Sequence, residues 1–241
     1  MKSVALIARR ELAAYLRTWT GYVIIAVVLA VDGLLFNAFA MGGVNKRSAE
    51  VVSLFFYFSS GTTMVASVFI AMRLLAEERQ SGTIALLYSS PVRDVEIVLG
   101  KFFSALGFLT LMTALTFFMP LLVMVNGKIS LGHVLAGYFG LLLIGAASLA
   151  IGTFGSVLAK NQVVAAILSG CILVGLLVSW LLSNVTERPF SEVFTALALH
   201  GKHFQPFQQG IVHLRDVVYY VAVAWVALFA ATRVLEARRW R

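Results

Sequence analysis

Few side chains in this sequence combine the types and spacing that chemistry requires. His200 and His203 could share a metal, but no nearby carboxylate or cysteine completes a site, so we expect both to be solvated loop residues. The one cysteine, Cys171, excludes a disulfide and is expected to be a small buried apolar residue. Gly100-Lys101 lacks the preceding glycine and the following Ser or Thr of a phosphate-binding loop. We therefore predict no metal, no cofactor and no catalytic group, and no ATP site of that type.

Asp32 is the exception, because an ionisable side chain inside an apolar segment is costly in lipid and is by default a functional hypothesis. The apolar segment 51–75 is also rich in hydroxyl groups, among them Ser59, Ser60 and Thr63. We take these four residues as candidates for a translocation path. A purely structural hydrogen bond for Asp32 fits the sequence equally well.

The elements that must position these residues are apolar helices. Hydrophobic residues make up 60% of the 241 positions and charged residues 12%. Runs of about 20 apolar residues, the length that crosses a bilayer, occur at 22–39, 51–75, 102–125, 134–158, 163–182 and 217–235. None of these runs alternates with the period of two that a transmembrane barrel requires. The sequence predicts an all-α, polytopic membrane protein with six spans in one transmembrane domain, 1–241.

Basic residues indicate the orientation. If the amino terminus is cytoplasmic, 13 of the 19 Lys and Arg fall on the cytoplasmic side. Both termini are therefore expected inside, at the cytoplasmic membrane, with 184–216 outside. Contact of these basic residues with anionic lipid explains most of the net charge of +8, so no nucleic-acid partner is predicted.

Residues 1–18 have the pattern of a helix lying flat at the inner membrane interface. Val4, Ala8 and Leu12 share one face, and Arg9 and Arg10 lie on another. An ordinary cytoplasmic extension of the first span is the alternative. A cleaved signal peptide is a further one, because an A-x-A pattern follows the first apolar run at 38–40.

Small residues recur every four positions in two of the spans. Ser148, Gly152 and Ser156 do so in the fourth, and Ala166 and Gly170 in the fifth. Such rows let neighbouring helix backbones approach closely. We interpret both rows as packing surfaces.

The largest cytoplasmic connection, 76–101, reads as ordered structure. The second span is expected to continue to Arg79 and to stop at Gly82, where glycine can take a left-handed conformation. A short helix follows from Thr83, with an apolar face that includes Ile84 and Leu87. Pro91 suits the first position of the next helix. An exposed apolar face of this size predicts a protein partner.

This connection resembles the signature of type-2 ABC exporter permeases, particularly the branch of gliding-motility and copper-accessory permeases. The similar residues are Glu77 to Ile84, Leu86-Leu87, Ser90-Pro91-Val92 and Gly100-Lys101, with a second block from His203 to Tyr220. The resemblance covers nearly the full chain.

The resemblance implies a permease subunit that moves a cargo when paired with a separate ATP-binding subunit, which would bind the ATP. The connection would be a coupling helix, and the residues carried over to ATPase coupling are Glu77, Glu78, Gly82, Thr83, Ile84, Leu87 and Pro91. A second permease copy or a paralogue would complete the complex. A self-contained secondary transporter or channel is the competing class, but spans one to three do not recur as spans four to six.

Overall fold

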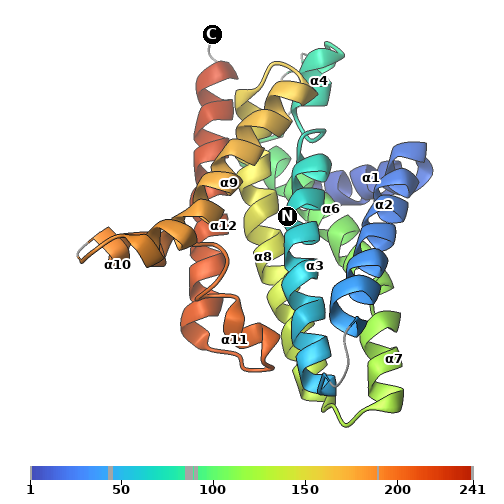
Figure 1. The fold of residues 1–241 in the computed structure, drawn as a ribbon. Helices are drawn as coiled ribbons and strands as arrows, with labels where there is room; N and C mark the ends of the chain where they lie inside the picture. The colour runs from blue at the N-terminus through green and yellow to red at the C-terminus, as the bar shows by residue number, and fades with distance from the viewer. Residues whose placement is uncertain (1, 43–45, 85–88, 90–91, 189, 240–241) are drawn as a thin grey trace.

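The computed structural model describes residues 2–42, 46–84, 89, 92–188 and 190–239. This part of the chain consists of helices and turns and contains no strand, as predicted (Figure 1). The helices in chain order are α1 Lys2–Arg17, α2 Trp19–Leu35, a π-helical segment η1 Phe36–Met41, α3 Ser48–Ala71, α4 Ala76–Gln80, α6 Asp94–Leu115, α7 Phe118–Asn126, α8 Leu131–Leu158, α9 Gln162–Val185, α10 Phe190–Leu197, α11 Gln205–Gln208 and α12 Leu214–Arg239.

Six helical stretches in the described residues are long and apolar enough to cross a membrane, which confirms the prediction of six spans. They are Trp19–Met41, Ser48–Gln80, Asp94–Val125, Leu131–Leu158, Gln162–Ser183 and Leu214–Arg238. The chain is therefore a multi-pass membrane protein. In Figure 1, α4 and the carboxyl end of α12 lie at one end of the bundle, called here the α4 end. The segments α7 and α11 lie toward the opposite end, the α11 end.

The centre of the bundle is the contact between α3 and α8. Three glycines of α8, Gly137, Gly145 and Gly152, allow it, because an added side chain at any of them would collide with a neighbour. A Cβ at Gly152 would lie 2.4 Å from the Cβ of Ala71, and one at Gly137 would lie 2.2 Å from the ring of Phe56. The predicted small-residue row on α8 is thus a packing surface. The predicted row on α9 does not pack within the described chain at Gly170, because an added Cβ would have no neighbour within 4 Å there.

The outer helices α2, α9 and α12 bury little of their surface and turn apolar side chains outward, as lipid-facing helices do. Cys171 of α9 is among the exposed residues, so the expectation that it is buried was wrong. A thiol is only weakly polar, and its exposure to lipid costs little.

The amino-terminal segment forms helix α1, which runs across the bundle and contacts α6 (Figure 1). Tyr15 fixes it. The phenol ring stacks on Phe108 with the ring centres 5.1 Å apart, and its hydroxyl donates to the carbonyl of Ile70 at 3.1 Å. At the other end of α1, the side chain of Ile7 lies so close to Gly100 that no Cβ would fit there. The first helix is therefore attached to both α3 and α6.

Candidate functional site

The amino terminus of helix α4 is capped by a hydroxyl group from another span. The backbone N–H groups of Leu75 and Ala76 both donate to Ser156 Oγ of α8, each at 3.0 Å. The first N–H groups of a helix have no partner within the helix itself. Ser156 satisfies two such groups where α3 gives way to α4, and so ties the start of α4 to α8.

Two further bonds join α4 to the turn between α8 and α9. The guanidinium of Arg79 donates to the carbonyl of Ala159 at 3.1 Å. The side-chain oxygen of Gln80 accepts from the backbone N–H of Gln162 at 3.4 Å. Helix α4 has only five residues, so contacts along its whole length fix its direction.

A partly buried ion-pair cluster lies on the other side of α4. Lys101 of α6 is 2% exposed, and its Nζ lies 2.8 Å from Glu78 of α4 and 3.5 Å from Glu11 of α1. Burial opposes ionisation of Glu11, but Lys101 and Arg10 outweigh it, so the pKa of this carboxyl is lowered. A buried ammonium is tolerated only with such partners. Lys101 therefore connects three helices through charge.

Glu77 and Glu78, predicted as coupling residues, face different neighbours. Glu77 accepts two hydrogen bonds from Arg73, at 2.9 and 3.2 Å, while its side chain remains 42% exposed. Arg73 also donates to the hydroxyl of Thr20 on α2. Glu78 is turned inward to Lys101. Only Glu77 of the pair therefore presents a surface to a partner.

The tip beyond α4 has the backbone that was predicted. Gly82 has φ +75°, the left-handed conformation that favours glycine. Gly82 and Thr83 are exposed, Ile84 is half-buried, and Thr83 Oγ1 lies 2.9 Å from the hydroxyl of Ser81.

Two of the predicted coupling residues, Leu87 and Pro91, lie outside the described residues. The next helix, expected from Pro91, begins instead at Asp94, where the side chain of Glu96 accepts the N–H of Arg93.

The hydroxyl groups of α3 point into the bundle. Asp32 of α2 is 4% exposed and accepts a hydrogen bond of 2.6 Å from Thr62. Asp32, Ser59 and Thr63 line a narrow gap between α2, α3, α6 and α8 that has no room for a water molecule. All four path candidates are buried in the described structure. Asp32 thus makes the structural hydrogen bond that the sequence left open.

The two loop histidines are buried, so the expectation that both are solvated was wrong. His200 Nε2 lies 2.8 Å from Ser60 Oγ, and burial lowers the pKa of His200. His203 Nδ1 lies 2.8 Å from a carboxylate oxygen of Asp216, and its ring stacks on Tyr219 with the centres 4.0 Å apart. Aromatic neighbours and specific partners enclose these loop residues, which no short-range pattern showed. No cluster of three metal-ligating residues exists among the described residues.

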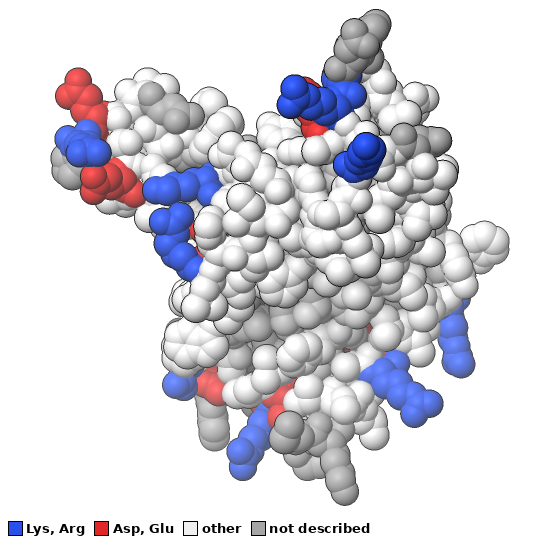
Figure 2. Space-filling view, turned by 90° about the horizontal axis from the view of Figure 1, so that it is seen from below, with Lys and Arg blue, Asp and Glu red and all other residues white. Residues whose placement is uncertain are grey.

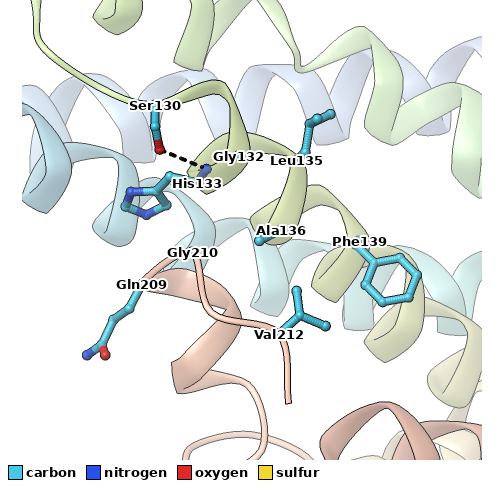
Figure 3. A pocket seen from close by; sticks show the side chains of 9 residues that line it. All are labelled: Ser130, Gly132, His133, Leu135, Ala136, Phe139, Gln209, Gly210 and Val212. Atoms are coloured by element: carbon cyan, nitrogen blue, oxygen red, sulfur yellow. Dashed lines mark hydrogen bonds between the residues drawn. The ribbon is translucent and has the colours of Figure 1, made fainter. Parts of the chain in front are cut away.

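The α11 end carries an open groove of about 670 Å³, lined by the start of α8 and by the segment between α11 and α12. Figure 3 shows Ser130 accepting the N–H of His133 at its rim, whereas Gln209 points away from it. None of its lining residues is a lysine, an arginine or a carboxylate. Seen from this end, charged side chains lie toward the rim of the molecule (Figure 2). This face offers no concentration of charge to a ligand.

Six candidate spans and a short helix held at one end of the bundle define a polytopic membrane protein. Residues 18–232 match the ABC-2 family transporter proteins, and the chain belongs to this family. Proteins of this family are membrane subunits of ABC transporters. A search among curated proteins gave no match.

Sequence reasoning missed the residues that hold α4 in place. Ser156 was interpreted only as a small packing residue, and Lys101 only as a cytoplasmic basic residue, as part of a rejected phosphate-binding loop and as part of a resemblance. Glu11 was not considered. The one available signal was charge, because Lys101 stands at the edge of an apolar run and needs a carboxylate partner there.

Proposed function

We propose that this chain is the permease subunit of an ATP-driven exporter and that its α4 loop docks on a separate ATP-binding subunit. Family membership supports the transport role. The observation that carries the docking surface is the construction of the loop. Helix α4 is tied to α8 by Ser156 and to α6 by Lys101, while its tip at Gly82 and Thr83 is exposed.

This construction suits the transmission of motion. A partner that displaces the tip also displaces the spans to which α4 is attached, since short hydrogen bonds and ion pairs leave little slack. In this proposal Glu77, Gly82, Thr83, Ile84, Leu87 and Pro91 contribute the docking surface. Glu78 does not contact the partner and instead fixes α4 through its ion pair with Lys101.

The remaining features of the complex follow from the same proposal. The partner binds the ATP, a second permease copy or a paralogue completes the transporter, and the α4 end with both termini lies in the cytoplasm. The protein then resides in the cytoplasmic membrane, and 184–216 lies outside. The proposal also assigns the chain to the branch of gliding-motility and copper-accessory permeases, which the sequence similarity at 76–101 and 203–220 supports.

Gly82 provides the test of coupling. A valine at φ +75° is strained by about 1–2 kcal/mol, so Gly82→Val should redirect the tip. Gly175→Val on the outer face of α9 is the control, because a Cβ meets no neighbour there either and φ is ordinary.

We expect Gly82→Val to reduce ATPase recovery in co-purification, or to uncouple hydrolysis from transport, and Gly175→Val to do neither. Full recovery and full coupling of the Gly82→Val permease would refute the docking surface. A wild-type permease that transports with no ATPase present would instead indicate a secondary transporter. Impermeant labelling of a Ser81→Cys variant from outside the cell would refute the orientation.

A further inference from the structure

The connection from α10 to α12, residues 198–213, is called here the α11 segment. Connections usually run over the surface of a protein, because their backbone polar groups need water or another partner. This connection is packed into the bundle instead, and Ala198, Leu199, Phe204 and Phe207 are fully buried. It contacts α3 and α8 (Figure 1). Specific side-chain contacts hold it there.

Three histidines attach the α11 segment to three different spans. His203 Nδ1 lies 2.8 Å from a carboxylate oxygen of Asp216 on α12. His133 Nε2 of α8 lies 2.7 Å from a backbone carbonyl oxygen of α11. His200 Nε2 lies 2.8 Å from Ser60 Oγ on α3. Because an imidazole gains a proton near neutral pH, the strength of each attachment can depend on pH.

Two of these attachments tolerate a protonated imidazole. A carboxylate and a carbonyl only accept hydrogen bonds, so the ring nitrogen that contacts them carries a proton in either charge state of the ring. At His203 a positive ring also has the carboxylate of Asp216 as its partner. His133 is only half-buried and lines the open groove at the α11 end, so a charge on its ring lies beside solvent. Neither attachment should fail in acid.

His200 lies in a different environment. It is 9% exposed, and its ring contacts the rings of Tyr57 and Phe204, with the centres 5.1 and 5.5 Å apart. Its hydrogen-bond partner, Ser60, is an uncharged hydroxyl. An unpaired charge is far less stable in such a site than in water, and burial accordingly lowers the pKa of His200. Protonation of His200 therefore favours a state in which the ring has left this site.

The charged and titratable side chains around the α11 segment do not compensate a charge on His200. They are Asp32 on α2, Tyr57 on α3, His133 and Tyr138 on α8, Arg215, Asp216, Tyr219 and Tyr220 on α12, and Lys202 and His203 in the segment itself. Two of them are carboxylates, and both have other partners, since Asp216 contacts His203 and Asp32 contacts Thr62. Helix α9 contains no charged residue. Burial is accordingly the one cause of the pKa shift of His200 among the described residues.

We propose that His200 is an acid-sensitive latch, which holds the α11 segment on α3 when it is neutral and releases the segment when it is protonated. The ordinary pKa of the imidazole is 6.5, and burial lowers it in the closed form. The latch is therefore at full strength above pH 6.5 and weakens as the pH falls from 6.5 towards the lowered pKa. One proton is involved, so the ratio of released to closed form rises by at most about tenfold per pH unit.

Release of this latch affects the span that carries α4. Residues Ser48–Gln80 form one candidate span, in which α3 is followed by α4. A restraint on α3 at Ser60 therefore acts on the same span as the proposed docking loop. In the proposed exporter, acid should make α3 easier to displace and ATP hydrolysis faster. This effect rests on the proposed function, whereas the latch itself does not.

The latch can be tested on the full permease in nanodiscs by pulsed EPR. Spin labels at Lys202→Cys and Glu50→Cys report the distance between the α11 segment and the amino-terminal end of α3, and both positions are exposed. The background carries Cys171→Ala, which removes the native thiol. We expect one distance at about pH 8, and a second distance that gains population between about pH 6.5 and about pH 5.

His200→Gln separates the charge from the hydrogen bond. The amide keeps an N–H donor for Ser60 and has no charge at any pH, so the second distance should not appear. His213→Gln is the matched control, because His213 belongs to the same segment and is exposed. This control should keep the wild-type transition. Ser60→Ala weakens the latch and keeps the imidazole, so its transition should occur at a higher pH than that of the wild type.

Hydrolysis by the complex with the co-purified ATPase tests the effect on function. The ratio of the rates of the wild type and of His200→Gln cancels the pH dependence of the ATPase itself. We expect this ratio to rise as the pH falls below 6.5, the ordinary pKa of the imidazole.

Four outcomes would contradict a part of this proposal or of its basis. A single EPR distance at every pH would overturn the latch. A transition that persists in His200→Gln and disappears in His203→Gln would assign the acid response to the pair with Asp216 instead. An unchanged ratio of hydrolysis rates beside an intact transition would overturn the effect on hydrolysis. A wild-type complex without hydrolysis would refute the exporter function, and the EPR distances of the permease alone would still decide on the latch.

Discussion

The two ends of the bundle are held together by different kinds of contact. At the α4 end, α4 is attached through an ion-pair cluster at Lys101 and through backbone bonds to Ser156. At the α11 end, the segment around α11 is attached mainly through packed aromatic rings, with two polar pairs, His200–Ser60 and His203–Asp216, beside them. Phe204, Phe207 and Tyr220 are all fully buried, and Tyr220 donates to the carbonyl of Leu199 at 2.7 Å.

This difference separates the two ends in mechanical terms. A hydrogen bond or a buried ion pair weakens steeply when its geometry changes, so α4 cannot shift without moving α6 and α8 or breaking a bond. Aromatic packing consists of many weak contacts, none of which is decisive alone. The α4 end is therefore suited to transmit a displacement and the α11 end to resist one. Single substitutions should accordingly cost more at the α4 end.

The largest effect is expected at Lys101. Lys101→Met leaves Glu78 and Glu11 facing each other in a partly buried site without their cation, at a cost of about 3–5 kcal/mol in the free energy of unfolding. Thermal melting in detergent measures it. Exposed Lys160→Met is the control. Adding Glu78→Gln and Glu11→Gln to Lys101→Met should restore most of the stability. A single mutant that melts like the wild type would contradict the comparison.

A smaller loss is expected at Ser156. Ser156→Ala removes the acceptor of two buried N–H groups and should cost about 1–3 kcal/mol. Hydrogen exchange at Leu75 and Ala76 should quicken in parallel. Ser148→Ala on the same helix is a matched control, because Ser148 is buried and its hydroxyl has no partner among the described residues. Equal effects of the two substitutions would show that Ser156 has no special role.

Tyr220 tests the α11 end. Tyr220→Phe keeps the ring and removes one hydrogen bond, so the expected loss is about 0.5–1.5 kcal/mol. Co-purification with the ATPase should be unaffected. Tyr22→Phe, at an exposed position of α2, should change neither quantity. A loss of ATPase binding in Tyr220→Phe would remove the distinction between the two ends.

The smallest effect is a pH dependence at the α4 end. Because the pKa of Glu11 is lowered from its ordinary value of 4.5, its contribution to stability is present above pH 4.5 and is lost as the pH falls through the folded-state pKa. Melting temperatures between neutral and acidic pH should show this loss. In Glu11→Gln the part due to this residue should disappear. An identical acid profile in the variant would show that Glu11 does not contribute.

Sequence reasoning predicted the positions of the helices and turns better than it predicted which helices pack against one another. The spans were predicted because a bilayer imposes a length and an apolar composition on each. The left-handed turn at Gly82 was predicted because few residues other than glycine adopt it. The length of a span and the conformation of a glycine both depend on local sequence alone, so the sequence of one segment is enough to predict them.

The inward side of each span could not be derived in this way. The hydroxyl groups of α3 suggested a path, yet Ser67 donates to the carbonyl of Thr63 and Ser60 contacts His200, more than a hundred residues away. The spacing of small residues likewise did not distinguish Gly152, which packs closely on α3, from Gly170, where an added Cβ would meet no atom within 4 Å. Which helix lies opposite is decided by the packing of the whole bundle.

The cluster around Lys101 also has a consequence for the order in which the protein assembles during synthesis. Chains are made from the amino terminus, so Glu11 and Glu78 have both left the ribosome before Lys101 follows, and the lysine finds its carboxylates already present. Ser156 emerges 55 residues after Lys101. The α4 loop thus acquires its charged anchor with the third span and its backbone anchor only with the fourth. A nascent permease cannot offer a finished docking surface until four spans have been inserted.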